Sequence, residues 1–340
     1  MYIRLANFLS KKKKIIKTSG RKLKMASEAY QDMKLFSCNS NPALAKEIAD
    51  NLGVELGDCK VSKFSDGEIS VSIGESVRGK DVFIIQSTND PVNDNLMELL
   101  IMTDAVKRAS AKSVTAVIPY YGYARQDRKS KPRDPITSKL VANMIVAAGV
   151  DRVMTMDLHA NQEQGYFDIP VDHLKGMPIL VNYFKGENID DLVIVSPDHG
   201  SVSRARNMAK PFNVPIAIID KRRPEPNKSE IMNVIGDIEG KNCLIVDDMI
   251  DTAGTICNAA KALMDLGAKS VRAAATHAVL SGPAIERIKE SDIQEMIFLN
   301  TIPVPAEKKL DKIKVLSVGK FFAEIIRRVQ TNTPVSELFE

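Results

Sequence analysis

The chain has 340 residues, of which 44% are hydrophobic and 5% aromatic, and it contains no tryptophan. This length suggests two domains of ordinary size, each with enough apolar residues for a core. Few aromatic residues argue against a protein that stacks nucleic-acid bases, and no apolar run is long enough to cross a bilayer. We therefore expect neither a nucleic-acid partner nor a membrane partner.

The formal net charge of +4 is concentrated at the N-terminus. Residues 1–24 contain nine Lys or Arg and no acid, which leaves 38 basic and 43 acidic residues in the rest of the chain. We expect residues 1–33 to be a disordered basic extension; a transit peptide, a nucleic-acid-binding arm and a true start at Met25 are the alternatives. The four cysteines have no metal-ligand spacing, which favours free thiols and a cytoplasmic location.

Strand-like segments alternate with helical patterns along most of the chain. The predicted strands cover residues 34–38, 81–86, 113–118, 152–156, 192–195, 216–219, 243–246 and 271–275. The predicted helices cover residues 42–52, 92–110, 135–148, 201–210, 256–266 and 320–328. Such alternation is typical of parallel sheets covered by helices, so the predicted fold class is α/β, with two domains that each contain a mainly parallel sheet.

Three further features concern the domain organisation. Residues 57–73 end in an alternating apolar and polar run, which predicts a hairpin inserted in the first sheet. We expect an N-terminal domain at 34–170 and a C-terminal domain at 171–328. The C-terminal tail 329–340, together with the helix before it, is expected to return to the N-terminal domain.

The segment Tyr120 to Lys129 follows a predicted strand and combines three tyrosines with two arginines, a glutamine and a lysine. Aromatic rings can stack on a base, and the cationic side chains are donors for phosphate oxygens. The segment could therefore bind a nucleotide. A solvated basic loop is the alternative that composition alone would favour.

Two other strand ends carry a histidine and carboxylates. His159 lies between Asp157 and Asp168, and Asp198 follows the next predicted strand. A single histidine is more often structural, and Mg²⁺ prefers oxygen ligands, so residue chemistry alone does not predict a histidine ligand. Asp157 and Asp168 could equally order the loop through hydrogen bonds.

Residues 219–227 contain three consecutive cationic residues and two prolines, which predicts an extended loop after a strand. Residues 246–255, with the sequence VDDMIDTAGT, join a buried strand to a helix. Free N–H groups at a helix N-terminus favour a phosphate, and small residues let the backbone approach it closely. The predicted phosphate loop consists of Asp251, Thr252, Ala253, Gly254 and Thr255, preceded by Asp247 and Asp248 as acceptors for ribose hydroxyls. An ordinary strand-to-helix turn with an acidic cap is the alternative.

Taken together, these segments resemble the class I ribose-phosphate diphosphokinases, also called phosphoribosyl pyrophosphate synthetases. The match runs from about residue 34 to residue 339, includes Thr276 to Ala284, and leaves residues 1–33 outside. The resemblance implies two domains of type I phosphoribosyltransferase-like fold. It also implies transfer of the diphosphoryl group of ATP to O1 of ribose 5-phosphate, with a requirement for Mg²⁺.

The resemblance assigns roles to individual residues. The implied ATP-binding residues are Phe64, Asp66, Gly67 and Glu68, which act from a neighbouring subunit, and Arg125 and Gln126. The implied magnesium ligands are His159 and Asp198, and the residues implied to close over the transferring phosphates are Lys221 and Arg223. Asp247, Asp248 and the loop 251–255 would hold ribose 5-phosphate.

The family's assembly implies a homo-oligomer, a hexamer built from dimers. Pro334-Val335-Ser336 stands where the family has Ser-x-Ser near an allosteric site for ADP or phosphate, which weakens the implication of regulation. Two other functions stay open. A type I phosphoribosyltransferase would share the phosphate loop but would need no ATP segment, and a non-catalytic regulatory subunit would carry interrupted loops.

Overall fold

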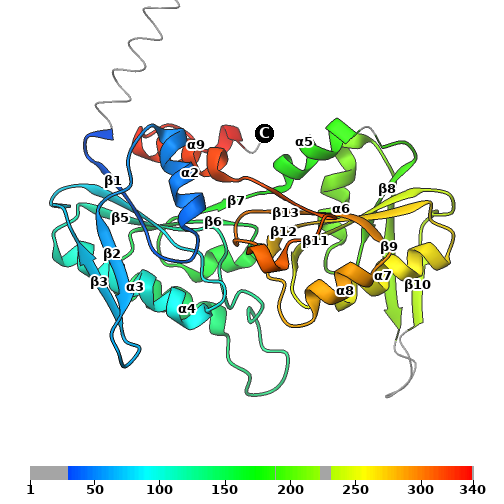
Figure 1. Ribbon diagram of the computed structural model, residues 1–340, viewed down its shortest axis with the longest axis horizontal. Coiled ribbons are helices and arrows are strands. Elements are labelled where there is room, and N and C mark those ends of the chain that lie inside the picture. Colours follow the sequence, from blue (N-terminus) through cyan, green and yellow to red (C-terminus); the bar gives the residue numbers. More distant parts are fainter. Residues whose placement is uncertain (1–29, 188, 223–230, 339–340) are drawn as a thin grey trace, which may run out of the picture.

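The computed structural model describes residues 30–187, 189–222 and 231–338. Figure 1 shows two halves side by side, each built around a central sheet with helices above and below it. The expectation for the basic extension falls almost entirely on residues that the structure does not describe. Among the described residues, no helix combines the length and apolar character that a bilayer span requires.

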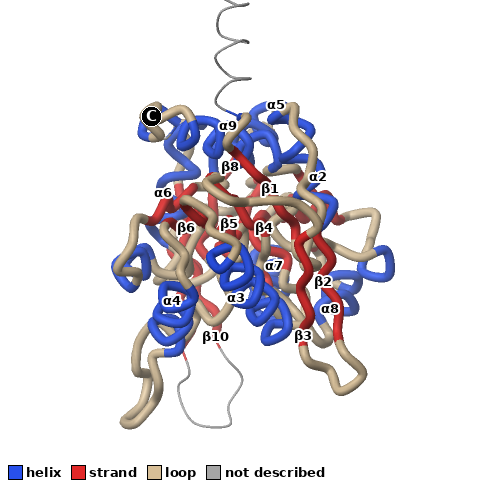
Figure 2. The backbone as a smooth tube through the Cα atoms, turned by 90° about the vertical axis from the view of Figure 1, so that its left-hand side faces the viewer, coloured by secondary structure: helices blue, strands red, loops and turns tan. Residues whose placement is uncertain are grey.

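The first half contains a five-stranded sheet in which all neighbours are parallel, in the order β1-β4-β5-β6-β7. Its strands are β1 (Met33–Ser37), β4 (Asp81–Ile85), β5 (Ser113–Ile118), β6 (Arg152–Met156) and β7 (Val171–Leu174). Its helices are α2 (Pro42–Leu52), α3 (Val92–Arg108) and α4 (Thr137–Ala148). Figure 2 shows α2 on one side of these strands and α3 and α4 on the other.

The second half contains a seven-stranded sheet in the order β10-β9-β8-β11-β12-β13-β14. Its strands are β8 (Leu192–Ser196), β9 (Ile216–Arg222), β10 (Ile231–Ile235), β11 (Asn242–Ile250), β12 (Ser270–Ala278), β13 (Ile293–Leu299) and β14 (Ile313–Leu316). The helices of this half are α5 (Met177–Glu187), α6 (Val202–Ala209), α7 (Gly254–Asp265) and α8 (Ala284–Glu290). Within the described part β10 runs antiparallel to β9 and the other pairs are parallel, so the predicted α/β fold class is confirmed.

Alternate residues of each strand face opposite cores, as the two-residue period of a strand requires. In β1, Phe36 packs with α3 and α4, whereas Leu35 packs with α2 and the C-terminal helix α9 (Gly319–Gln330). The core on the α2 side continues into the second half, where it includes residues of β8, β11, α5 and α6. One apolar core therefore runs beneath both sheets and fixes the two halves against each other.

The structure differs from several predictions. β7 pairs with β6, so the first sheet extends to Leu174, beyond the expected boundary at residue 170. The hairpin of β2 (Cys59–Lys63) and β3 (Ile69–Ile73) forms a sheet of its own and is not part of the five-stranded sheet; one of its faces packs against the core around α3. β11 continues to Ile250, past the predicted end at Val246. α9 packs with α2.

We predict that Gly122→Ala lowers the free energy of unfolding by about 1–3 kcal/mol, because overpacking forces a buried backbone to move. A Cβ on Gly122 would lie 2.3 Å from the carbonyl oxygen of Thr88. Denaturant unfolding is the measurement. Gly186→Ala is the control, since a Cβ there meets nothing within 4 Å. Equal stability of the Gly122 variant and the parent would refute the close approach.

Candidate active site

Two large cavities open where the carboxyl ends of strands from both sheets meet, the usual place for a ligand in α/β folds. The first has a volume of about 990 Å³, and its lining includes His159, Asp198 and Asp248. The second has a volume of about 960 Å³ and is lined by Arg125, Gln126 and Asp251, among others. Both cavities thus contain residues that the sequence assigned to substrates or metal.

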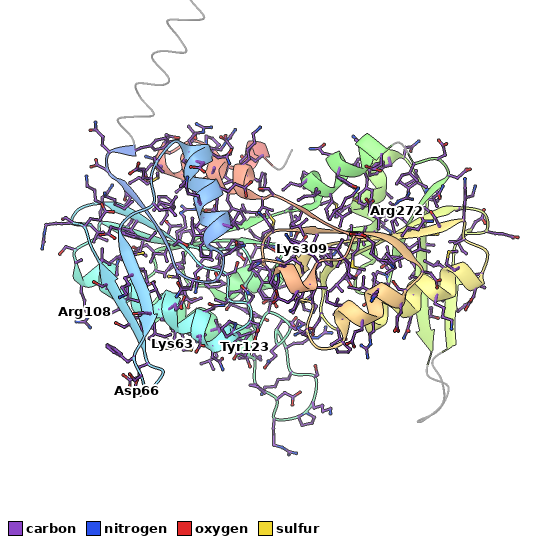
Figure 3. All side chains as sticks on the ribbon, in the orientation of Figure 1. Lys63, Asp66, Arg108, Tyr123, Arg272 and Lys309 are labelled. Carbon is purple, nitrogen blue, oxygen red and sulfur yellow. The ribbon has the colours of Figure 1, made fainter. Side chains whose placement is uncertain are left out.

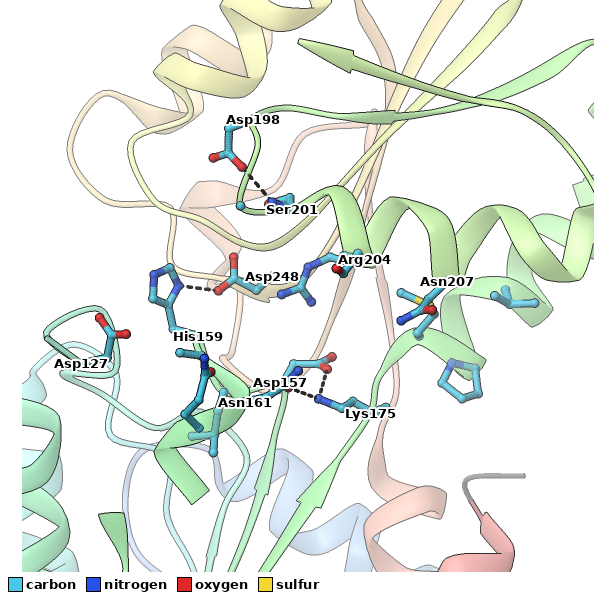
Figure 4. A pocket seen from close by; sticks show the side chains of 18 of the residues that line it. Asp127, Asp157, His159, Asn161, Lys175, Asp198, Ser201, Arg204, Asn207 and Asp248 are labelled. Carbon is cyan, nitrogen blue, oxygen red and sulfur yellow. Dashed lines mark hydrogen bonds and ion pairs between the residues drawn. The ribbon is translucent and has the colours of Figure 1, made fainter. Parts of the chain in front are cut away.

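His159 and Asp248 form an ion pair across the first cavity, as Figure 4 shows. His159 follows β6 in the first half, Asp248 belongs to β11 in the second, and their Nδ1 and Oδ2 atoms are 2.7 Å apart. The hydrogen bond with Asp248 raises the pKa of His159. Burial opposes ionisation of Asp248, but the bond with His159 and the charge of Arg204 outweigh it and hold the pKa of Asp248 low.

Asp247 precedes Asp248 in β11 and is also held by neighbours. It accepts hydrogen bonds from the Ser201 hydroxyl and from the backbone N–H of Asp248, both at 2.9 Å. Burial raises the pKa of Asp247, and the negative charge of Asp248 raises it further. The two carboxyl groups therefore differ. Asp248 has a lowered pKa and is the ionised member, whereas Asp247 has a raised pKa and holds a proton more readily.

The predicted phosphate loop leads directly into α7, which begins at Gly254. Ala253 is buried and has φ = +58°, whereas Thr252 and Thr255 are exposed. Asp251 binds Arg125 at 2.5 Å and also accepts a hydrogen bond from Ser281. The N–H groups of a helix's first turn have no partner within the helix, so the loop offers donors for an anion.

Four of the remaining predicted residues lie away from this group, and two more cannot be placed in it. Phe64, Asp66, Gly67 and Glu68 form the turn of the β2–β3 hairpin, where the Phe64 ring is 59% exposed, and they line neither cavity. Figure 3 shows Asp66 at the hairpin tip, far from the centre of the molecule. The backbone of Lys221 lies in β9 opposite Met232, but its side chain and the whole of Arg223 lie outside the described residues.

Comparisons with known proteins agree with this geometry. Residues 33–149 match the N-terminal domain of ribose phosphate pyrophosphokinase, and residues 222–340 match the phosphoribosyl synthetase-associated domain. The ribose-phosphate pyrophosphokinase of Caldanaerobacter subterraneus subsp. tengcongensis is 65% identical over 308 residues, which cover 90% of this chain and 98% of that protein. The chain belongs to the ribose-phosphate pyrophosphokinase family.

Two further relatives extend the comparison. The ribose-phosphate pyrophosphokinase of Bacillus subtilis is 60% identical over 315 residues, or 92% of this chain and 99% of that protein. The crystal structure of phosphoribosylpyrophosphate synthetase from Mycobacterium smegmatis superposes with a TM-score of 0.85 at 44% identity, covering 88% of this chain and 99% of that one. The resemblance stated from the sequence is confirmed at the level of the family.

Several residues of the first cavity were missing from the predicted site of this pyrophosphokinase. They are Lys175, Ser201 and Arg204. The signal for the last two was their place in the first residues after Asp198, where a predicted helix starts beside a strand end. Asp157 accepts hydrogen bonds from the Gly176 N–H at 2.9 Å and the Thr276 hydroxyl at 2.6 Å, so it orders the loop, one of the two roles considered for it.

Glu163, four residues after His159, is a fully buried acid that the sequence analysis also overlooked. Its carboxyl group accepts hydrogen bonds from the Ser138 hydroxyl at 2.5 Å and from the Ala160 N–H at 2.7 Å. Burial raises the pKa of Glu163, although these two hydrogen bonds oppose the rise. The folded state therefore favours the protonated form relative to the unfolded state.

We predict that Glu163→Gln increases the free energy of unfolding at pH 8. The folded pKa of Glu163 lies above the unfolded value, so the parent loses stability as the pH rises through the folded pKa, and the neutral amide avoids that loss. The advantage should shrink as the pH falls from 8 toward the ordinary carboxyl pKa of 4.5, when measured by denaturant unfolding. The exposed Glu290→Gln is the control, and an advantage that does not depend on pH would contradict the assignment.

Proposed function

We propose that the chain is a ribose-phosphate diphosphokinase, which transfers the diphosphoryl group of ATP to O1 of ribose 5-phosphate and releases AMP. The supporting observation is the pairing of His159 with Asp248 in a cavity that also contains Asp198, next to the anion-binding start of α7. A sugar phosphate and a triphosphate would there approach each other from different halves of the molecule.

Ribose 5-phosphate would bind at β11 and α7. The loop 251–255 would bind the 5-phosphate through its N–H groups, and Asp247 and Asp248 would accept hydrogen bonds from the ribose hydroxyls. These contacts orient the ring so that O1 faces the β-phosphorus of ATP. Positioning of this kind supplies much of the rate in phosphoryl transfer, where the protein has little covalent chemistry to perform.

ATP would bind along Arg125 and Gln126. Arg125 bonds to Asp251, so the proposed nucleotide segment and the proposed phosphate loop are in direct contact across 126 residues of sequence. Phe64, Asp66, Gly67 and Glu68 would complete the nucleotide site of a second copy, since the hairpin turn projects away from both cavities of its own chain. Lys221 and Arg223 would supply cationic donors for the transferring phosphates. This arrangement requires a homo-oligomer, which we propose to be a hexamer.

Magnesium would be held by His159 and Asp198. Among the described residues no cluster of three or more His, Cys, Asp or Glu side chains forms a metal site. The pair of His159 and Asp198 offers only one carboxylate. This suits Mg²⁺, which keeps several waters and binds through one or two carboxylates together with substrate phosphates. When bound, the ion would neutralise charge on the phosphate oxygens.

Two further parts of the proposal concern the cellular location and an allosteric ligand. A cytoplasmic location is supported by the four free cysteines, Cys38, Cys59, Cys243 and Cys257. ADP or phosphate remains a proposed allosteric ligand, and Pro334 marks the difference from the family's pattern at that site.

The decisive experiment measures AMP formation from ATP with and without ribose 5-phosphate. We expect AMP only when the sugar phosphate is present, in a 1:1 ratio with 5-phosphoribosyl 1-diphosphate, and no AMP after removal of divalent metal by a chelator. A type I phosphoribosyltransferase or a regulatory subunit would produce no AMP under any of these conditions. Absence of AMP in the presence of both substrates and magnesium would therefore refute the proposal.

We predict that Asp247→Ala weakens ribose 5-phosphate binding about 10- to 100-fold, the loss expected when a buried ribose hydroxyl is left without its hydrogen-bond partner. Isothermal titration calorimetry with ribose 5-phosphate is the measurement. Asp292→Ala is the control, because Asp292 is exposed and lies outside both cavities. Unchanged sugar affinity in the Asp247 variant would remove this residue from the site.

A further inference from the structure

Arg204 is a half-buried cation in the wall of the first cavity, and it has no partner among the described residues. It lies near the start of α6, and Figure 4 shows its guanidinium directed toward Asp248. Within the described part of the chain it forms no hydrogen bond or ion pair, and its Nε atom is buried without an acceptor. Buried polar groups are rarely left unpaired, so the Nε atom needs an acceptor that the described part of the chain does not supply.

The charge of Arg204 nevertheless acts on the acids around it. After burial and the hydrogen bonds described above, it is a further influence that lowers the pKa of both Asp247 and Asp248. The guanidinium is thus near enough to both carboxyl groups to affect them, while no carboxylate oxygen of residues 30–187, 189–222 or 231–338 is bonded to it. Its accessible N–H groups are left for a ligand in the cavity.

The other cations of this cavity are placed differently. Lys175 donates to the Asn161 side chain at 2.7 Å and lies 4.0 Å from Asp157. Arg128 and Lys185 are exposed at the cavity's edge. Arg204 therefore combines partial burial, a permanent charge and open donors in the same cavity as His159 and Asp198. A guanidinium in that position matches the oxygens of a phosphate group, which it can bind through two parallel hydrogen bonds.

We propose that Arg204 is a catalytic residue that binds the diphosphoryl oxygens while this group passes from ATP to the sugar. The inference rests on the proposed function. In the transfer, O1 of ribose 5-phosphate bonds to the β-phosphorus, and the bond from that phosphorus to the oxygen bridging the α-phosphorus breaks. The bridging oxygen leaves with AMP, and the O1 proton passes to solvent. Arg204 stabilises the charge on the group in transit, through donors already in place before the reaction.

The experiment compares Arg204→Met and Arg204→Lys with Arg206→Met, a control in the same helix that is exposed and lines neither cavity. Steady-state kinetics give kcat and KM for both substrates, and calorimetry gives the affinities for ribose 5-phosphate and 5-phosphoribosyl 1-diphosphate. For Arg204→Met we expect kcat to fall about 100- to 1000-fold, as for other lost contacts to developing charge. Lysine should restore part of this loss, and Arg206→Met should behave like the parent.

The two affinities separate a ligand contact from a structural role. Loss of a diphosphate contact should weaken 5-phosphoribosyl 1-diphosphate at least 30-fold while ribose 5-phosphate changes less than 3-fold. Equal weakening of both ligands, or a kcat within 3-fold of the parent, would overturn the inference. If the Met variant does not fold, the Lys variant decides, and parental kcat in that variant overturns the inference. The parent enzyme tests the proposed function separately, since absence of AMP from the parent refutes that function rather than the role of Arg204.

Discussion

Two adjacent acids at the end of a buried strand are the constraint around which this site is organised. Asp247 and Asp248 repel each other, and β11 leaves them little access to water. Two adjacent buried carboxyl groups persist only when partners compensate their charge, because removal of charge from water is costly. The compensation comes from His159 in the other half of the molecule, from the Ser201 hydroxyl, and from the more distant charge of Arg204. Asp248, one of the acids that would hold the sugar, thus also joins the two halves.

Local patterns were enough to predict most of the architecture. The helix at 42–52 begins and ends where predicted, because Asn41 caps its first turn and Gly53 adopts the left-handed conformation after its last. The strands at 113–118 and 152–156 also agree with the predicted bounds. Elements with weak patterns were missed. β7 has only four residues, two of them polar, and it is recognisable only through its pairing with β6.

The candidate site shows the same limit. The loop at the start of α7 could be predicted because its residues are contiguous and their chemistry is local. The contact of His159 with Asp248 joins residues 89 apart, and that of Arg125 with Asp251 joins residues 126 apart. No periodicity encodes such distances, since they depend on how two sheets pack. Arg204 was missed for a related reason. Its only signal in the sequence is its place soon after Asp198, and a single arginine near the start of a polar helix is ordinary until the neighbouring strand ends are in place.

The position of α9 has a consequence for how the protein is made. Phe322, Ile325 and Ile326 are completely buried in the core that also contains Leu44 and Ile48, so residues near the two ends of the chain share one interior. A ribosome releases the N-terminal half long before it synthesises α9, and until then part of the surface of α2 lacks its cover. The apolar residues of α2 that α9 covers therefore stay exposed in the nascent chain until α9 has been synthesised. Expression of the N-terminal half without α9 would leave that surface of α2 permanently exposed.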